Sequence, residues 1–174
     1  GTIWPLCSGT DLPGAAHPRE MNVPTCFDVT IDNGVAHLRL NRPDELNTMN
    51  VAFWSELPEL IEQIDAAASA RAIVISSTGR HFSAGMDLSV FTGGGVLGDP
   101  GVSETGRQRA HLWSMVQKLQ DSFTVLERVR MPVLTAIQGG CIGGAVDMVC
   151  AADMRYASAD AFFCIQEINI GMTA

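Results

Sequence analysis

Two glycine-containing segments carry the residue types best suited to chemistry. The first, His81-Phe-Ser-Ala-Gly-Met-Asp-Leu88, follows the apolar run 72–76, and the second, Gln138-Gly-Gly-Cys-Ile-Gly-Gly-Ala-Val-Asp147, follows the run 133–137. Both runs are short and rich in β-branched residues, as expected of strands covered on both faces. Because α/β sheets present their ligand sites beyond the carboxyl ends of their strands, we expect a ligand site at these segments.

The glycine cluster of the second segment does not match a nucleotide-binding pattern. Cys141 stands where G-x-G-x-x-G needs a glycine, and the Lys-Ser/Thr pair of a phosphate loop is absent. Glycines just before a helix leave backbone N–H groups free to face a ligand. Since no basic residue stands nearby, a polarised carbonyl oxygen suits this site better than a polyphosphate, and that is the chemistry of an oxyanion hole. Close helix–strand packing is the alternative explanation for the glycines.

Two isolated carboxylates, Asp147 and Glu167, lie next to apolar sequence. Asp147 falls on the first turn of the helix expected after the glycines, and Glu167 follows the apolar run 161–165. A carboxylate buried among apolar groups is costly unless it is paired, hydrogen-bonded or protonated, so such a position favours a functional role. Alternatively, Asp147 complements its helix dipole and Glu167 lies on a solvated edge. Periodicity alone does not separate the two interpretations.

Apolar periodicity predicts the elements that hold these segments. Residues 26–31 and 35–40 are expected to form a β-hairpin around Asn33-Gly34, because these two residue types supply the positive φ angles of a tight turn. Asn50 can cap a helix whose apolar residues recur at helical spacing (Phe53, Leu57, Leu60, Ile61 and Ile64). Pro58 predicts a kink in that helix or a shorter first helix.

The second half of the chain alternates helices and strands. Residues 79–106 are loop-like and rich in glycine, and a long helix follows with one apolar face (Leu112, Val116, Leu119, Phe123 and Leu126). We expect a third helix near 144–152, strands at 154–157 and 161–165, and a strand running into a turn over 167–174. This alternation predicts an α/β layered fold.

Composition argues against several classes of protein. The chain has 174 residues, 47% of them hydrophobic, a net charge of −8 and a single lysine, Lys118. This acidic balance disfavours non-specific binding to nucleic acid, which depends on basic surface. No apolar run approaches the ~20 residues that span a bilayer. The five cysteines lack the paired spacing of a zinc site, and their scatter indicates reduced thiols in an intracellular protein.

The first twenty residues follow no periodic pattern and contain three prolines and three glycines. Met21 precedes a regular strand pattern, so we expect the native protein to start there. Residues 1–20 are then a leader that is foreign to the native protein or poorly ordered, and residues 21–174 form the folded domain.

Several motifs together resemble the crotonase (enoyl-CoA hydratase/isomerase) superfamily. They are His81–Leu88, Pro132–Asp147, Ala152-Asp-Met-Arg-Tyr-Ala-Ser158, Asn41-Arg-Pro43 and Leu46-Asn-Thr-Met-Asn50, and the likeness extends from about Phe27 to Ala174. The resemblance implies a spiral of ββα units followed by a C-terminal helical trimerisation region, which we expect to be missing from this chain. It also implies binding of acyl-CoA thioesters and stabilisation of an enolate.

The resemblance assigns roles to the first segment and to one glycine. The backbone N–H groups of Met86 and Gly144 correspond to the two oxyanion donors of the family, which point at the thioester oxygen. Residues that correspond to the lining of the CoA path are Ala84, Gly85, Met86, Asp87 and Leu88. Asp87 is expected to cap a helix rather than to act as a catalyst.

Asp147 and Glu167 occupy the two acid–base positions of the family. In enoyl-CoA hydratases both are glutamates. The aspartate, with Gly139-Gly-Cys-Ile-Gly-Gly144 and Ala161-Phe-Phe163, looks most like the Δ3,5–Δ2,4-dienoyl-CoA isomerases of fatty-acid β-oxidation. There the second carboxylate pairs with an aspartate eight residues downstream, one residue past Ala174. On this resemblance Glu167 shuttles a proton, and Asp147 orients or modulates the site.

Two alternatives stay open at this point. An enoyl-CoA hydratase would use the same carboxylates to activate water, and an inactive homologue would bind acyl-CoA without turnover. The resemblance implies no separate cofactor and no metal, because coenzyme A is part of the substrate. It implies a homotrimer or hexamer. The net charge of −8, the single lysine and the lack of a long apolar run argue against a nucleic-acid or membrane partner. The expected location is cytoplasmic in a bacterium and mitochondrial or peroxisomal in a eukaryote.

Other side chains fit structural roles better than catalytic ones. Cys141 has no histidine partner in sequence for nucleophilic catalysis, and His81 is expected to anchor its loop. Trp54 and Trp113 suit helix packing. Residues 93–106 are expected to line the acyl pocket.

Overall fold

The structure is a computed structural model that describes residues 24–91, 101 and 103–171. Its strands are β1 (Phe27–Asp32), β2 (Val35–Leu40), β3 (Ala72–Ser77), β4 (Val133–Ile137), β5 (Gly140–Ile142), β6 (Met154–Ala157) and β7 (Phe162–Cys164). Its α-helices are α1 (Val51–Ala67), α2 (Thr105–Arg128) and α3 (Gly144–Cys150), and its 3-10 helices are η1 (Pro43–Glu45), η2 (Leu88–Phe91) and η3 (Glu167–Ile170). The expected leader, residues 1–20, lies outside the described residues, as does most of the expected acyl-pocket segment 93–106.

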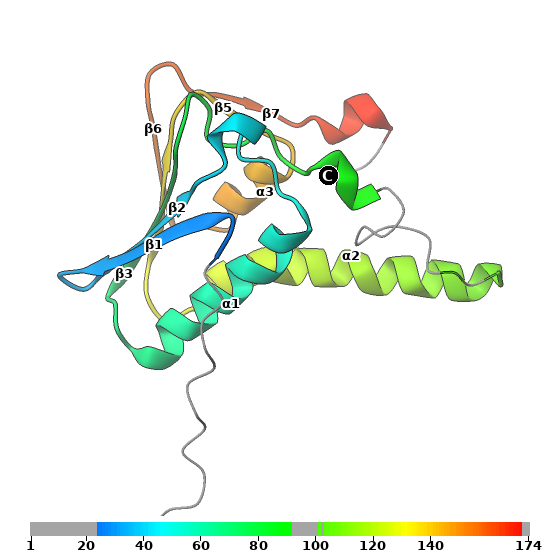
Figure 1. The fold of residues 1–174 in the computed structure, drawn as a ribbon, viewed down its shortest axis with the longest axis horizontal. Helices are drawn as coiled ribbons and strands as arrows, with labels where there is room; N and C mark the ends of the chain where they lie inside the picture. Colours follow the sequence, from blue (N-terminus) through cyan, green and yellow to red (C-terminus); the bar gives the residue numbers. More distant parts are fainter. Residues whose placement is uncertain (1–23, 92–100, 102, 172–174) are drawn as a thin grey trace, which may run out of the picture.

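A five-stranded sheet in the order β1-β2-β3-β4-β6 forms the body of the domain (Figure 1). Strand β1 is antiparallel to β2, and every following pair is parallel. Parallel neighbours end at the same edge of a sheet, so the segments that follow β3 and β4 start side by side. The predicted α/β layered fold is confirmed, and a smaller parallel pair, β5 with β7, is added to it.

The first hairpin forms where the sequence predicts it. Asn33 and Gly34 have φ angles of 50° and 79°, and the strand register closes on the pair Asp32 and Val35. Two consecutive positive φ angles match the twist of the flanking strands, and this is why asparagine and glycine occupy the turn.

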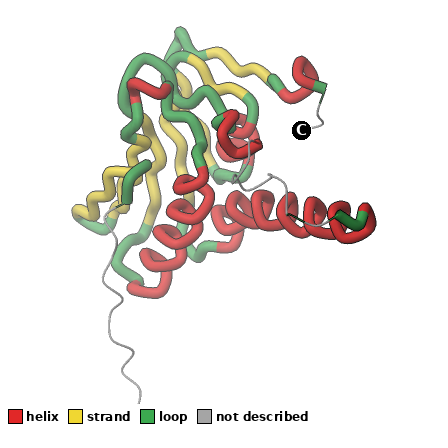
Figure 2. The backbone as a smooth tube through the Cα atoms, turned by 45° about the vertical axis from the view of Figure 1, so that its right-hand side comes forward, coloured by secondary structure: helices red, strands yellow, loops and turns green. Residues whose placement is uncertain are grey.

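Helices α1 and α2 pack side by side along one face of the main sheet (Figure 2). Of the two alternatives predicted for Pro58, the shorter helix is wrong, since α1 continues for 17 residues. Proline has no N–H to donate to the carbonyl four residues earlier, that of Trp54. The Trp54 carbonyl instead accepts a hydrogen bond at 3.2 Å from the buried Ser122 hydroxyl of α2. The neighbouring helix thus satisfies the group that the proline leaves unpaired.

Asn50 caps α1 and also ties it to the first strand. Its Oδ1 accepts a hydrogen bond from the Phe53 N–H at 3.0 Å and a second one from Cys26 Sγ at 3.2 Å. The predicted cap is confirmed, and the contact with the cysteine thiol is an addition that periodicity could not supply.

Replacing this cap, Asn50→Ala, is expected to lower the free energy of unfolding by about 1 kcal/mol, because one first-turn N–H loses its acceptor. Urea denaturation measures the change. Ser55→Ala is the matched control on the same helix, because the Ser55 hydroxyl is exposed and bonds only locally to the Ala52 carbonyl. A loss no larger than that of the control would contradict the capping role.

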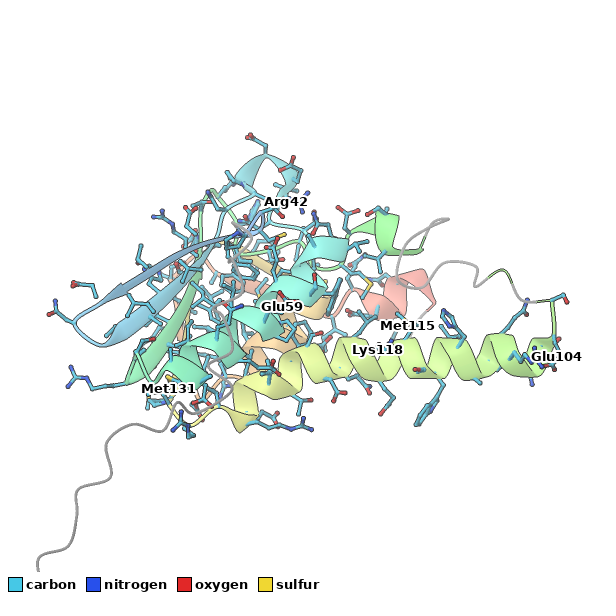
Figure 3. The ribbon with its side chains drawn as sticks, turned by 60° about the horizontal axis from the view of Figure 1, so that its bottom comes forward. Arg42, Glu59, Glu104, Met115, Lys118 and Met131 are labelled. Atoms are coloured by element: carbon cyan, nitrogen blue, oxygen red, sulfur yellow. The ribbon has the colours of Figure 1, made fainter. Side chains whose placement is uncertain are left out.

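The first half of α2 extends away from the body, with Glu104 at its outer end (Figure 3). Leu119, Ser122 and Leu126 are its buried residues. Only the second half of the expected apolar face is therefore buried, since Leu112 and Val116 are exposed and Trp113 is 68% exposed. The packing role expected for Trp113 is not found, whereas Trp54 is buried as expected.

Two local elements differ from expectation. The glycine cluster forms strand β5 before it enters α3, because Gly140–Ile142 pairs with β7. Residues 167–170 form the 3-10 helix η3 instead of a strand. The N–H and the side-chain amide of Asn169 both donate to Gln166, and such local bonds compete with strand pairing.

No helix in the described ranges combines the length and apolarity needed to cross a membrane.

Candidate active site

The two glycine segments contact each other directly beyond the ends of β3 and β4. The Ser83 N–H donates to the Gly140 carbonyl at 3.2 Å, and the Ile142 N–H donates to the Ser83 carbonyl at 3.1 Å. Gly85 lies against the second segment with a φ of +84°, and a Cβ added to it would lie 2.4 Å from the Ile142 carbonyl oxygen. Only glycine allows this close approach. Gly85 and the hydrogen bonds of Ser83 therefore hold the two segments together at one edge of the sheet.

A third segment, residues 46–49, runs along the first one. The Met49 N–H donates to the Gly85 carbonyl at 2.8 Å, and the Met49 carbonyl accepts from the Asp87 N–H at 3.1 Å. The Met49 side chain is fully buried, and its Sδ lies 3.5 Å from where a Cβ on Gly144 would be. The sequence identified the motif around Met49 but not its position beside the first glycine segment. An apolar Met49 between the polar residues Thr48 and Asn50 was the available signal.

Two backbone donors are left open where these segments meet. The N–H groups of Met86 and Gly144 have no acceptor within the described part of the chain. Gly144 is the first residue of α3, and the first N–H groups of a helix have no partner inside it. The preceding N–H, that of Gly143, is occupied by the Cys164 carbonyl at 2.8 Å. Met49 pairs with Met86 in a β-bridge and its Sδ lies beside Gly144, so both donors lie near the same residue.

The carboxylates Asp147 and Glu167 also come together here. Glu167 starts η3, and its Oε1 lies 3.0 Å from where a Cβ on Gly143 would be. Asp147 is not buried among apolar groups, since α3 turns Ala145, Met148 and Val149 inward and leaves Asp147 exposed. Partial desolvation of its carboxylate, and next the negative charge of Glu167, raise the pKa of Asp147. The proximity of the two carboxylates, and not the burial expected for Asp147, therefore favours a functional role for the pair.

Asp147→Asn is expected to stabilise the fold at pH 7. A raised pKa means that the folded state binds the proton more tightly than the unfolded state, so stability is complete below the ordinary value of 3.8 and is lost as pH rises through the folded pKa. Asparagine does not ionise, so its Tm should exceed that of the parent at pH 7, with the gain vanishing below pH 3.8. Asp121→Asn, at an exposed position on α2, should leave Tm unchanged. An equal or lower Tm for Asp147→Asn at pH 7 contradicts the interpretation.

Asp87 performs a structural task at the start of η2. Its Oδ1 accepts from the Ser89 N–H at 2.9 Å, and its Oδ2 accepts from the Thr48 hydroxyl at 3.1 Å. These hydrogen bonds, first of all those from Ser89, lower the pKa of Asp87. Its neighbour Leu88 is exposed, and the assignment of Ala84–Leu88 to the CoA path stays a prediction.

His81 and Cys141 support the loops. The His81 Nδ1 accepts from the Gly140 N–H at 2.9 Å and its ring meets the edge of Phe162, so the expected anchoring role is confirmed. Burial, and next the nearby Cys150, raise the pKa of the Cys141 thiol to about 12. A protonated buried thiol is a poor nucleophile. In the described residues, no three His, Cys, Asp or Glu side chains gather to hold a metal ion.

Comparisons with known proteins show the family of the chain. The sequence model of the family described as enoyl-CoA hydratase/isomerase matches residues 30–174. The mitochondrial Delta(3,5)-Delta(2,4)-dienoyl-CoA isomerase of Mus musculus is 43% identical over 140 residues, which are 80% of this chain and 42% of that protein. The peroxisomal enzyme of the same name from Arabidopsis thaliana is 36% identical over 143 residues, 82% of this chain and 51% of that protein. The chain spans about half the length of these curated relatives.

Solved structures show the same fold. A Thermobifida fusca YX protein assigned as an enoyl-CoA hydratase, in complex with acetoacetyl-CoA, superposes with a TM-score of 0.71 at 28% identity, over 85% of this chain and 56% of that chain. An enoyl-CoA hydratase from Shewanella pealeana ATCC 700345 superposes with a TM-score of 0.70 at 24% identity, over 86% of this chain and 52% of that chain. The chain therefore belongs to the enoyl-CoA hydratase/isomerase family.

Proposed function

We propose that the protein converts a 3,5-dienoyl-CoA into a 2,4-dienoyl-CoA. The observation that carries this proposal is the pairing of two carboxylates, Asp147 and Glu167, beside two open backbone donors. The identity of 41–43% to mammalian enzymes named Delta(3,5)-Delta(2,4)-dienoyl-CoA isomerase supports it.

The open N–H groups of Met86 and Gly144 hold the thioester oxygen. Loss of a proton from C2 sends the electron pair toward this oxygen, and the enolate charge then develops where the two donors point. Because the donors are backbone groups already fixed by the fold, no reorganisation is needed as the charge appears. One such donor contributes about 3 kcal/mol to the lowering of a reaction barrier.

Glu167 accepts the proton from C2, in this proposal. The resulting enolate is conjugated with the C3–C4 and C5–C6 double bonds, so delivery of a proton to C6, from protonated Glu167 or from water, places the double bonds at C2–C3 and C4–C5. One proton leaves and one returns, and no redox change occurs. Asp147 orients or modulates the site, and partial desolvation together with the charge of Glu167 raises the pKa of its carboxyl group.

Absorbance at the wavelength of the conjugated 2,4-dienoyl thioester tests the proposal with the purified protein and a 3,5-dienoyl-CoA. The expected result is a catalytic rise in absorbance that depends on protein concentration. Binding of acyl-CoA with no isomerisation, together with good hydration of a 2-enoyl-CoA, would overturn it. Binding without turnover of either substrate would identify an inactive acyl-CoA-binding homologue.

Hydration of a 2-enoyl-CoA is the second candidate function. A Mycobacterium tuberculosis protein assigned as an enoyl-CoA hydratase is 36% identical over 140 residues. Asp147 and Glu167 lie close enough to interact electrostatically, and a pair of carboxylates can position and deprotonate a water molecule. The same substrate comparison separates the two activities.

The proposal extends to assembly, cofactor use and location. Exposed apolar side chains on separate elements support a homotrimer or hexamer (Trp113, 68% exposed; Phe163, 50%; Ile168, 75%). Coenzyme A is part of the substrate, and no separate cofactor or metal is required. Relatives named mitochondrial and peroxisomal support those compartments for a eukaryotic source, and a bacterial source implies the cytoplasm. Size-exclusion chromatography with light scattering measures the assembly.

A further inference from the structure

The backbone N–H groups of residues 84–87 differ in their hydrogen-bond acceptors. Those at the two ends of the run, on Ala84 and Asp87, donate to carbonyls of the segment 46–49 at 3.0 and 3.1 Å. Met86 is the residue of this run whose N–H has no acceptor in the described part of the chain. The remaining N–H belongs to Gly85, and its partner decides how the peptide planes before Met86 are held.

That partner is a side chain. The Gly85 N–H donates to Ser83 Oγ at 3.1 Å, and the same hydroxyl donates to the Asn47 carbonyl at 2.8 Å. Ser83 is fully buried, and its main chain forms the bridge to Cys141 in the second glycine segment. One residue thus contacts all three segments of the site.

The Ser83 hydroxyl is one of two hydrogen-bond partners that restrain Gly85. Gly85 has no Cβ, so its two backbone dihedral angles are limited only by its partners. Ser83 holds the peptide plane before Gly85, and the Met49 N–H holds the carbonyl after it at 2.8 Å. The Met86 N–H belongs to that second plane, so its direction follows from both restraints.

We infer that Ser83 is a positioning residue of the oxyanion hole, whose hydroxyl aims the Met86 N–H at the thioester oxygen. The inference rests on the proposed function, since it assumes that an acyl-CoA carbonyl occupies this place. Ser83 itself does not touch the substrate. It acts by occupying the Gly85 N–H and by fixing the peptide planes on either side of Gly85.

Ser83→Ala tests the inference in two measurements. The kcat for isomerisation should fall about 10- to 100-fold, less than the 10²- to 10³-fold loss of a whole oxyanion donor, because the donor is misaimed and not removed. KM should change less than about twofold, as for an interaction made mainly in the transition state. The bound 2,4-dienoyl-CoA should absorb at longer wavelength than the free thioester in the parent protein, because a polarised carbonyl shifts the chromophore. The variant should lose most of this shift.

Ser122→Ala is the matched control, because it removes another buried serine hydroxyl, bonded to the Trp54 and Lys118 carbonyls between α1 and α2. It should retain both kcat and the spectral shift. Ser83→Thr keeps the hydroxyl and should restore the shift. If Ser83→Ala does not fold, Ser83→Cys carries the test, and its weaker acceptor should give an intermediate shift.

Two outcomes would overturn the inference in distinguishable ways. A parent protein that shifts the spectrum, with Ser83→Ala retaining kcat and the full shift, removes the role of Ser83 and leaves the proposed function in place. A parent protein that binds the dienoyl-CoA without any shift removes the oxyanion hole, and with it the proposed function and the inference together.

Discussion

Glu167→Gln is expected to lower kcat for dienoyl-CoA isomerisation by about 10³-fold, within the range reported for loss of a general acid–base group. Glutamine has nearly the same shape as glutamate and can keep its place beside Gly143, but it cannot accept the proton from C2. KM should change little, because the acyl-CoA still binds. Steady-state kinetics with saturating 3,5-dienoyl-CoA measure the loss.

The matched control is Glu59→Gln, which removes an exposed carboxylate on α1 (Figure 3). It should keep the parent rate. A second readout comes from the neighbouring carboxylate. Removing the Glu167 charge takes away one of the two causes that raise the pKa of Asp147, so this pKa should fall toward 3.8 in the variant. If Glu167→Gln retains more than about a tenth of the parent kcat, a general-base role for Glu167 is wrong.

Gly85→Ala is expected to reduce both stability and activity. The φ angle of +84° costs an alanine about 1–2 kcal/mol. The added Cβ would lie 2.4 Å from the Ile142 carbonyl oxygen, so the two glycine segments must separate, at a further cost of about 1–3 kcal/mol. The Met86 N–H moves with them, and a displacement of about 1 Å can lower kcat by about 10²-fold.

Gly34→Ala, in the first hairpin, separates the two contributions to the stability loss. Gly34 has a φ of +79°, and the three nearest atoms that a Cβ there would meet belong to the exposed Arg71 side chain, which can move aside. The control should therefore lose only the free energy of unfolding that a positive φ costs an alanine, about 1 kcal/mol, and should keep its activity. Chemical denaturation and kinetics on both variants make the comparison. Equal losses of stability in the two variants would show that the contact with Ile142 does not constrain the site.

Much of the fold follows from local chemistry. Asn33 and Gly34 can adopt the positive φ angles of the hairpin, and the side chain of Asn50 can satisfy the first turn of α1 wherever that helix packs. Continuous apolar runs likewise identify the buried strands β3 and β4. These features were predictable because their causes lie within a few residues of each other along the chain.

Other features depend on residues that are distant in sequence. By local rules Pro58 kinks or ends a helix, yet α1 continues, and the Ser122 hydroxyl from α2 takes the place of the missing donor. The first half of α2 has an apolar stripe but is largely exposed, because in the described residues only its second half packs against α1 and the core. Periodicity reports which side of a helix is apolar and not whether a partner is present.

The candidate site likewise combines features that follow from local sequence with features that depend on distant residues. By itself, the sequence determined the two glycine segments, the carboxylates Asp147 and Glu167, and the placement of the segments after parallel strands. Only the tertiary structure decided that Asp147 is exposed and that the Ser83 hydroxyl links the first glycine segment to residues 46–49. The physical reason is that residue types and strand order are local properties of the chain. Direction of an N–H group and exposure of a carboxylate depend instead on hydrogen bonds and packing between residues that lie 20 to 60 positions apart.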